Sequence, residues 1–329
     1  MRSELCLVTG APGWLGTRLV ERLCQLKRKV RCLVLNPRLS KHLKEMGAQI
    51  VKGDVTDKST LYKALDGVYE VIHCAGIIHP KKIKDFYLVN TEGTRNLLEI
   101  SVKGGVKKFI YISSNSAQGR NIDRDTLMTE DGEHRPYMSY GKSKLIAEQI
   151  VKEFYEKHDL FTVIIRPCWY YGPGQPDRQT KLMRMIKSAR PLLFGGGKNL
   201  RSMSYIDNII DAILLAENKD VANGKTYWIA DETPYTTLEI YQTIADILGV
   251  ELKPRFIPSF ISALLRFGDN ILQRIGVYNQ LIHVGGEMTE NIACSIEKAK
   301  RELGYKPKIS LKEGMEISID WAARNNLIK

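Results

Sequence analysis

Short apolar runs alternate with amphipathic stretches through the first half of the chain. Leu5 to Val8 is an apolar run of strand type, and Trp14 to Gln25 repeats apolar residues at helical spacing. Strands that alternate with helices favour a parallel sheet covered on both faces, so we predict an α/β fold with a Rossmann-type, doubly wound sheet. The runs expected to be strands are Leu5–Val8, Val30–Leu35, Gln49–Lys52, Glu70–Cys74, Lys108–Ser113 and Phe161–Arg166, and the stretches expected to be helices are Trp14–Gln25, Ser40–Met46, Ser59–Leu65, Asn90–Lys103 and Tyr137–His158.

The pattern loosens after Pro167 into glycine- and proline-rich loops with interspersed helices. We expect residues 1–167, with parts of 200–230, to form the Rossmann domain. Residues 168–329 would mainly form a smaller, mixed C-terminal substrate-binding domain, interlocked with the first. The chain has 329 residues, more than the roughly 250–300 at which a single core stops growing, which agrees with this division.

A glycine-rich turn joins the first expected strand to the first expected helix. Gly10, Gly13 and Gly16 recur at a regular spacing, and Trp14 and Leu15 open the helix. Glycines let the main chain come close to a pyrophosphate, and free N–H groups at a helix N-terminus favour its negative charge. The order of strand, turn and helix therefore predicts that these residues form a dinucleotide-binding loop.

The residues after the second and third strands bear on which dinucleotide binds. Asn36 and Arg38 follow the second strand, Lys41 lies close behind, and no carboxylate is present there to bind a ribose diol. This favours NADP(H) as the cofactor, with NAD(H) as the alternative. The alternative role for Arg38 and Lys41 is that of solvated surface charges that bind no cofactor. Asp54 and Val55 follow the third strand, where a carboxylate can meet the adenine amino group or merely cap a helix.

Three side chains form a candidate hydride-transfer site. Tyr140 and Lys144 lie at helical spacing on an expected helix, so they share one face. Lys144 and an oxidised nicotinamide would favour the phenolate of Tyr140 and lower its pKa from about 10. Tyr140 could then exchange a proton with a substrate hydroxyl. Ser114, which ends an expected strand, could hydrogen-bond the reacting oxygen, and Ser113 and Ser116 are the alternatives.

The chain resembles the extended branch of the short-chain dehydrogenase/reductase superfamily, also called the NAD-dependent epimerase/dehydratase family. The matching segments occur in family order and cover nearly the whole chain: TGAPGWLG, GDV, HCAG, NTEGT, ISSNSAQG, YGKSK, RPCWYYGP, RSMSYIDN and KAKRELGYKP. Together they are specific for the family and not for a substrate.

The resemblance implies roles for individual residues. Tyr140 would be the proton donor or acceptor, Lys144 would hold the nicotinamide ribose and tune the tyrosine, and Ser114 would polarise the carbonyl. The resemblance also places these residues along the cofactor: Ala75, Gly76, Asn90 and Pro167. A homodimer is the expected assembly. Family members that act as redox sensors or scaffolds typically lose the tyrosine or the lysine, whereas this chain keeps both.

The residues around the substrate favour a nucleotide-sugar slightly. Sugar 4,6-dehydratases carry an acidic pair where this chain has Asn115 and Ser116, which disfavours dehydration and leaves an epimerase or ketoreductase outcome. Arg201 is similar to the arginine that binds the diphosphate in the epimerases, and Arg178 is a second candidate contact. For each arginine the alternative is a surface charge or an ion pair between domains.

The segment 257–277 points to a different substrate. It is longer than the corresponding epimerase loop, it is typical of an amphipathic helix, and it is similar to the 3β-hydroxysteroid dehydrogenase-like branch. That branch acts on apolar secondary alcohols and ketones. The helix could roof an apolar pocket, rest on a membrane surface or simply pack in the core. An apolar alcohol or ketone is therefore the alternative substrate.

The composition of the chain limits the kinds of ligand and partner that we expect it to bind. The net charge is +12 and the cations are spread along the chain, which favours a phosphate-bearing cofactor or small substrate over nucleic acid. The six cysteines show no CxxC pair and no metal-ligand spacing, so we expect reduced thiols and no metal site. No signal peptide or membrane-spanning run is recognisable, so we expect a cytoplasmic protein, with peripheral membrane contact left open.

Overall fold

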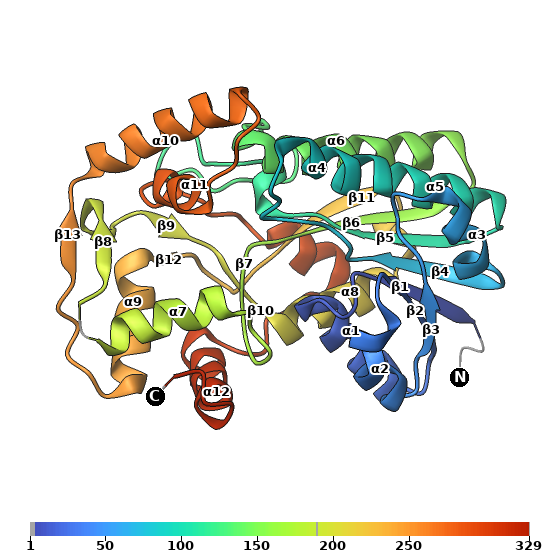
Figure 1. The fold of residues 1–329 in the computed structure, drawn as a ribbon, viewed down its shortest axis with the longest axis horizontal. Coiled ribbons are helices and arrows are strands. Elements are labelled where there is room, and N and C mark those ends of the chain that lie inside the picture. The colour runs from blue at the N-terminus through green and yellow to red at the C-terminus, as the bar shows by residue number, and fades with distance from the viewer. Residues whose placement is uncertain (1–3, 189, 329) are drawn as a thin grey trace.

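A seven-stranded parallel sheet with the order β11-β6-β5-β4-β1-β2-β3 lies at the centre of the protein (Figure 1). The computed structural model describes residues 4–188 and 190–328. The strands of the sheet are β1 (Leu5–Thr9), β2 (Lys29–Val34), β3 (Gln49–Lys52), β4 (Val68–His73), β5 (Lys108–Ile112), β6 (Phe161–Pro167) and β11 (Lys225–Ile229). The chain runs outward from β1 to β3 and then returns to place β4 on the other side of β1. The carboxyl ends of β1 and β4 therefore form the switch point at which open α/β sheets bind their ligands.

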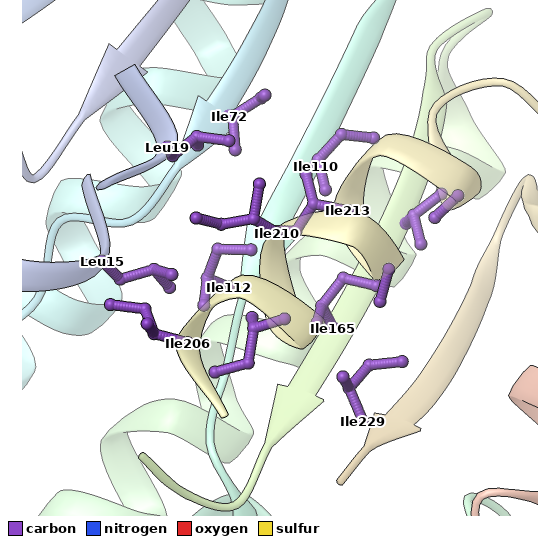
Figure 2. Packing of buried hydrophobic residues seen from close by; sticks show 14 of the residues in the cluster. Leu15, Leu19, Ile72, Ile110, Ile112, Ile165, Ile206, Ile210, Ile213 and Ile229 are labelled. Atoms are coloured by element: carbon purple, nitrogen blue, oxygen red, sulfur yellow. The ribbon is translucent and has the colours of Figure 1, made fainter. Parts of the chain in front are cut away.

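Helices cover both faces of this sheet, as the alternating pattern predicted. The helices of the sheet region are α1 (Trp14–Gln25), α2 (Lys41–Glu45), α3 (Lys58–Leu65), α4 (Ile83–Phe86), α5 (Gly93–Lys103), α6 (Met138–Lys157) and α8 (Ile206–Ala216). α1 and α8 pack Leu15, Leu19, Ile206, Ile210 and Ile213 against isoleucines of β4, β5, β6 and β11 (Figure 2). A second cluster joins α3, α5 and α6 to the opposite face. The doubly wound α/β fold is confirmed.

The rest of the chain forms a smaller layer at one end of the sheet (Figure 1). Its helices are α7 (Asp177–Lys187), α9 (Thr237–Leu248), α10 (Ser259–Arg274), α11 (Gln280–Glu287) and α12 (Leu311–Arg324), and its two-stranded pairings join β7 (Trp169–Tyr171) to β10 (Met203–Tyr205), β9 (Leu200–Arg201) to β12 (Tyr235–Thr236) and β8 (Leu192–Phe194) to β13 (Arg255–Ile257). A third apolar cluster holds α7, α9 and α12 together.

Most predicted elements lie within two residues of their observed bounds, and one differs in kind. The helix expected from Asn90 begins earlier, because a π-helical turn, η2 (Tyr87–Glu92), precedes α5. π-turns occur mostly as single turns near functional sites, and Asn90 lies inside this one. The cysteines are free, and the nearest pair, Cys168 and Cys294, keeps its sulfurs 3.4 Å apart. Within residues 4–188 and 190–328, no helix is long and apolar enough to span a bilayer.

Candidate active site

Helix α6 and the end of β5 bring the three predicted catalytic residues to the switch-point side of the sheet. Tyr140 is half-buried with its ring 5.8 Å from that of Phe86 (centroid to centroid), and the Ser114 hydroxyl lies close enough to the phenol to act on its pKa. Lys144 is buried one helical turn further on; its Nζ donates to the Ile112 carbonyl (2.8 Å) and lies 4.3 Å from the centre of the Tyr111 ring. The structure therefore places Tyr140 and Lys144 one turn apart on α6 and Ser114 in the turn after β5.

The charge environment of Tyr140 differs from the expectation. Burial raises the pKa of Tyr140, and the Ser114 hydrogen bond and the positive charge of Arg178 both lower it. The sequence attributed the lowering to Lys144 together with an oxidised nicotinamide, whereas here the lowering comes from Ser114 and Arg178. Burial lowers the pKa of Lys144 to about 7, since a charged amine loses its hydration there.

A glycine lets the catalytic helix approach the serine-bearing loop. Ser114 caps the short turn η3 (Asn115–Ala117), and a Cβ at position 141 would lie 2.3 Å from the Ser116 carbonyl oxygen. Any larger residue there would push α6 away from this turn. Gly141 thus sets the separation between Tyr140 and Ser114, and Asn115 and Ser116 lie beside the same site.

A buried ion pair fixes α6 to the sheet. The guanidinium of Arg166 on β6 donates to both carboxylate oxygens of Glu148 on α6, at 2.9 and 2.6 Å, and both side chains are almost inaccessible to water. Ser113 donates its hydroxyl to the same carboxylate. Sequence reasoning missed this pair, although a lone arginine at the end of an apolar strand was a usable signal.

Asn90 braces the loop after β4 against the catalytic helix. Its side-chain oxygen accepts from the Ile77 N–H (2.8 Å), and its Nδ2 donates to the Ile77 carbonyl and to Ser143 Oγ, each at 3.0 Å. The predicted cofactor residues Ala75 and Gly76 lie in this loop. The structure therefore gives Asn90 a positioning role for the loop.

The glycine-rich turn fits a dinucleotide pyrophosphate. Gly10 has a φ of +82°, and a Cβ there would lie 2.5 Å from the main chain of Cys74, so only glycine allows β1 and β4 to end side by side. No side chain caps the first turn of α1 and no acidic residue lies in it, so its N–H groups are left for an anion. Gly13 and Gly16 pack on the Gly10 carbonyl within the same turn.

Three other predicted cofactor residues, Trp14, Leu15 and Pro167, differ in what they contact. Leu15 points into the apolar core, so only its main chain can face a ligand (Figure 2). Trp14 donates its indole N–H to the Pro173 carbonyl (2.7 Å), which ties the turn to the loop after β7. Pro167 is buried at the end of β6. The turn and the start of the second layer are therefore linked directly.

The residues predicted for the adenosine end lie after β2 and β3. Asn36 accepts the main-chain N–H of Arg38 on its side-chain oxygen (3.0 Å). The Arg38 side chain is exposed. Asp54 accepts the Thr56 N–H (2.8 Å), while Asp57 caps α3, so Asp54 is not the helix cap considered as its alternative role. Val55 is buried in the cluster beneath α5.

The two candidate anion-binding arginines differ in availability. Arg201 is only 8% exposed; it donates to the Glu287 carbonyl (2.6 Å) and its guanidinium carbon lies 5.5 Å from the centre of the Trp169 ring. Burial lowers its pKa. Arg178 is exposed at the start of α7, and its charge acts on the phenols of Tyr140, Tyr170 and Tyr278. Of the two arginines, Arg178 is therefore the more accessible, although its Nε donates to the Gln179 side chain (3.2 Å).

Comparison with known proteins identifies a family and a fold. The profile of the 3-beta hydroxysteroid dehydrogenase/isomerase family matches residues 7–259. An uncharacterized protein of Sinorhizobium fredii is 38% identical, over 99% of this chain and 97% of its own, and the mouse sterol-4-alpha-carboxylate 3-dehydrogenase (decarboxylating) is 28% identical, over 97% and 91%. The structure of Thermus thermophilus UDP-glucose 4-epimerase in complex with NAD matches with a TM-score of 0.78 at 22% identity, over 96% of this chain and 98% of that one.

Breaking the buried ion pair tests whether it holds α6 in place. Arg166→Met leaves the Glu148 carboxylate buried without its counter-charge, so we expect the free energy of unfolding to fall by about 3–5 kcal/mol in urea titrations. Arg324→Met is the matched control, because Arg324 pairs with Asp320 on the surface; it should cost no more than about 1 kcal/mol. Equal losses in the two variants would contradict the role assigned to the pair.

Removing the Arg178 charge should shift the pH dependence of alcohol oxidation. In the predicted hydride-transfer chemistry the phenolate of Tyr140 would be the base in that direction, and the charge of Arg178 lowers the pKa of the phenol. Arg178→Gln therefore raises this pKa, and the rising limb of kcat/KM against pH moves to higher pH. Arg184→Gln, on the same helix, is the control because Arg184 pairs with Asp177 (2.7 Å). A wild-type profile for Arg178→Gln would show that its charge does not act on the phenol.

Proposed function

Because the chain belongs to the 3-beta hydroxysteroid dehydrogenase/isomerase family, within the extended short-chain dehydrogenases/reductases, we propose that it oxidises a secondary alcohol, or reduces the matching ketone, on an apolar substrate. The observation that supports an apolar substrate is that Arg201 is already bound to other groups of the protein. Its guanidinium is buried, hydrogen-bonded to a carbonyl and stacked over Trp169. A diphosphate would have to displace these contacts.

The protein's own side chains supply the proton chemistry. A bound nicotinamide accepts or donates the hydride at the reacting carbon. In oxidation, Tyr140 takes the hydroxyl proton onto its phenolate oxygen, and in reduction it returns a proton to the carbonyl oxygen. Ser114 hydrogen-bonds the same oxygen and stabilises charge that develops on it. Lys144 lies beside Gly76 and would meet the nicotinamide ribose from that side.

Aromatic side chains around Tyr140 support an apolar substrate. Phe86 packs on Tyr140 and on Tyr278, with ring centroids 5.8 and 5.5 Å apart. Burial, and to a smaller extent the neighbouring Tyr140, raises the pKa of Tyr170, so its phenol stays neutral beside the site. The α10–α11 pair supplies Tyr278 and also contacts the start of α6, where Gln273 accepts the Ser139 N–H (3.0 Å). The segment 257–277 thus adjoins the catalytic helix.

A nucleotide-sugar, which the sequence favoured slightly, is the second candidate. The specific observation for it is Arg178, an exposed cation whose field reaches Tyr140. An arginine in that place suits a phosphate oxygen of a substrate bound over the tyrosine. Epimerase or ketoreductase chemistry on a sugar carbon would use the same three catalytic side chains.

A substrate panel separates the two candidates. We expect turnover of sterols or other apolar secondary alcohols and ketones, and none of UDP-, GDP- or dTDP-sugars. Tyr140→Phe should lower kcat/KM by about 10²–10⁴-fold with the cofactor Kd unchanged, whereas Tyr155→Phe, on the exposed side of α6, should not. Turnover of the sugars alone would overturn the substrate class. Full activity of Tyr140→Phe would overturn the chemistry.

NADP(H) is the cofactor we propose, because Arg38 is exposed beyond the end of β2 and no carboxylate follows that strand. Arg38→Ala should weaken NADPH binding by about tenfold or more in fluorescence titrations and leave NADH binding unchanged. Lys44→Ala, at an exposed lysine on α2 that is not part of this prediction, is the control. Tighter binding of NADH than NADPH by the wild-type protein would contradict this preference.

A further inference from the structure

Helix α10 turns its apolar face to the solvent. Phe260, Leu264, Phe267, Ile271 and Ile275 follow one another at helical spacing, and each is between 47% and 69% exposed. We call these residues the outer stripe. Its ends are extended by two further exposed residues, Phe256 on β13 and Leu281 on α11. Figure 1 shows α10 along an outer edge of the molecule with α11 on its inner side.

The buried residues of the same helix are polar, and they form hydrogen bonds. Asp269 is buried, and its carboxylate accepts from Gln273 Nε2 (3.0 Å to each oxygen) and is 2.8 Å from His283 Nδ1. Ser262, also buried, donates to the Gly285 carbonyl (2.7 Å). Rotating the helix to bury the stripe would break this network. The core-packing explanation considered for this segment is therefore wrong for its apolar side.

The surface around the stripe is positively charged. From Leu252 to Gly286 the one acidic residue is Asp269, which is fully buried, so its charge does not reach the surface of this segment. Arg255 is exposed on β13, just before α10, and Arg274 is exposed as the last residue of α10. An exposed row of phenylalanine, leucine and isoleucine flanked by arginines is the composition of a helix that lies in a lipid headgroup region.

We propose that the α10–α11 face docks on an anionic lipid bilayer. A second copy of the chain fits this face less well, because a two-fold interface would set the arginines of one copy against those of the other. An anionic membrane complements both the apolar stripe and its basic ends. Since α10 contacts the start of α6, docking would bring the catalytic helix to the membrane surface. The inference goes beyond the proposed function and does not depend on the substrate.

Vesicle flotation with the whole protein tests this proposal without any activity measurement. The wild-type protein should float with phosphatidylcholine vesicles that contain phosphatidylglycerol, and less with phosphatidylcholine alone or in high salt. Phe260→Asp/Phe267→Asp should weaken binding at least about tenfold, because two exposed aromatic rings can no longer enter the lipid. Tyr62→Asp replaces an exposed aromatic on α3, away from this face, and should bind like the wild type.

A second variant separates the two forces. Arg255→Glu/Arg274→Glu keeps the stripe intact, so it should lose the preference for phosphatidylglycerol. Binding that is equal in all variants, or no flotation of the wild type, would overturn the proposal. So would a concentration-dependent dimer, seen by light scattering, that Phe260→Asp/Phe267→Asp converts to monomer while vesicles capture no protein. That result would assign the face to a second copy.

Discussion

The position of the catalytic helix depends on one buried ion pair. Glu148 and Arg166 are both removed from water, and two hydrogen bonds join the guanidinium on β6 to the carboxylate on α6, which holds the helix to the sheet at this point. Losing either partner would leave a charge that the interior cannot solvate. Lys144 lies one turn before Glu148 and Tyr140 one turn before that. The pair therefore fixes where the phenol and the amine stand.

Contacts between uncharged groups set how closely the neighbouring loops approach α6. Gly141 allows α6 to touch the turn that carries Ser114, and Asn90 holds the loop of Ala75 and Gly76 against Ser143. The electrostatics then follow from burial. Burial lowers the pKa of Lys144 to about 7 and raises the pKa of Tyr140. The positive charge of Arg178 lowers the pKa of the Tyr140 phenol. A substrate that brings its own negative charge would change this balance; an apolar one would not.

The sequence predicted the local features well because they depend on neighbours along the chain. The strand, glycine turn and helix at the N-terminus, the shared face of Tyr140 and Lys144, and the alternating elements up to Arg166 all follow from spacing. Features that depend on distant partners were missed. The Glu148–Arg166 pair and the contacts of Arg201 with Glu287 and Trp169 need the fold to be known.

Helix α10 shows a further limit of sequence patterns. Its period identifies an amphipathic helix, but a period alone does not say which face is inward. A buried polar network around Asp269 decided the orientation here, and it left the apolar face outside. The π-turn at Tyr87–Glu92 was missed as well, and Asn90 within it makes contacts across the fold that the local pattern does not show.

The most direct test of the central claim is a crystal structure of the protein with its nicotinamide cofactor bound. We expect the phenol oxygen of Tyr140 and the hydroxyl of Ser114 to face the nicotinamide ring together, with the amine of Lys144 at the adjoining ribose. A structure in which the cofactor occupies the glycine turn while the Tyr140 phenol points away from the ring would contradict the account.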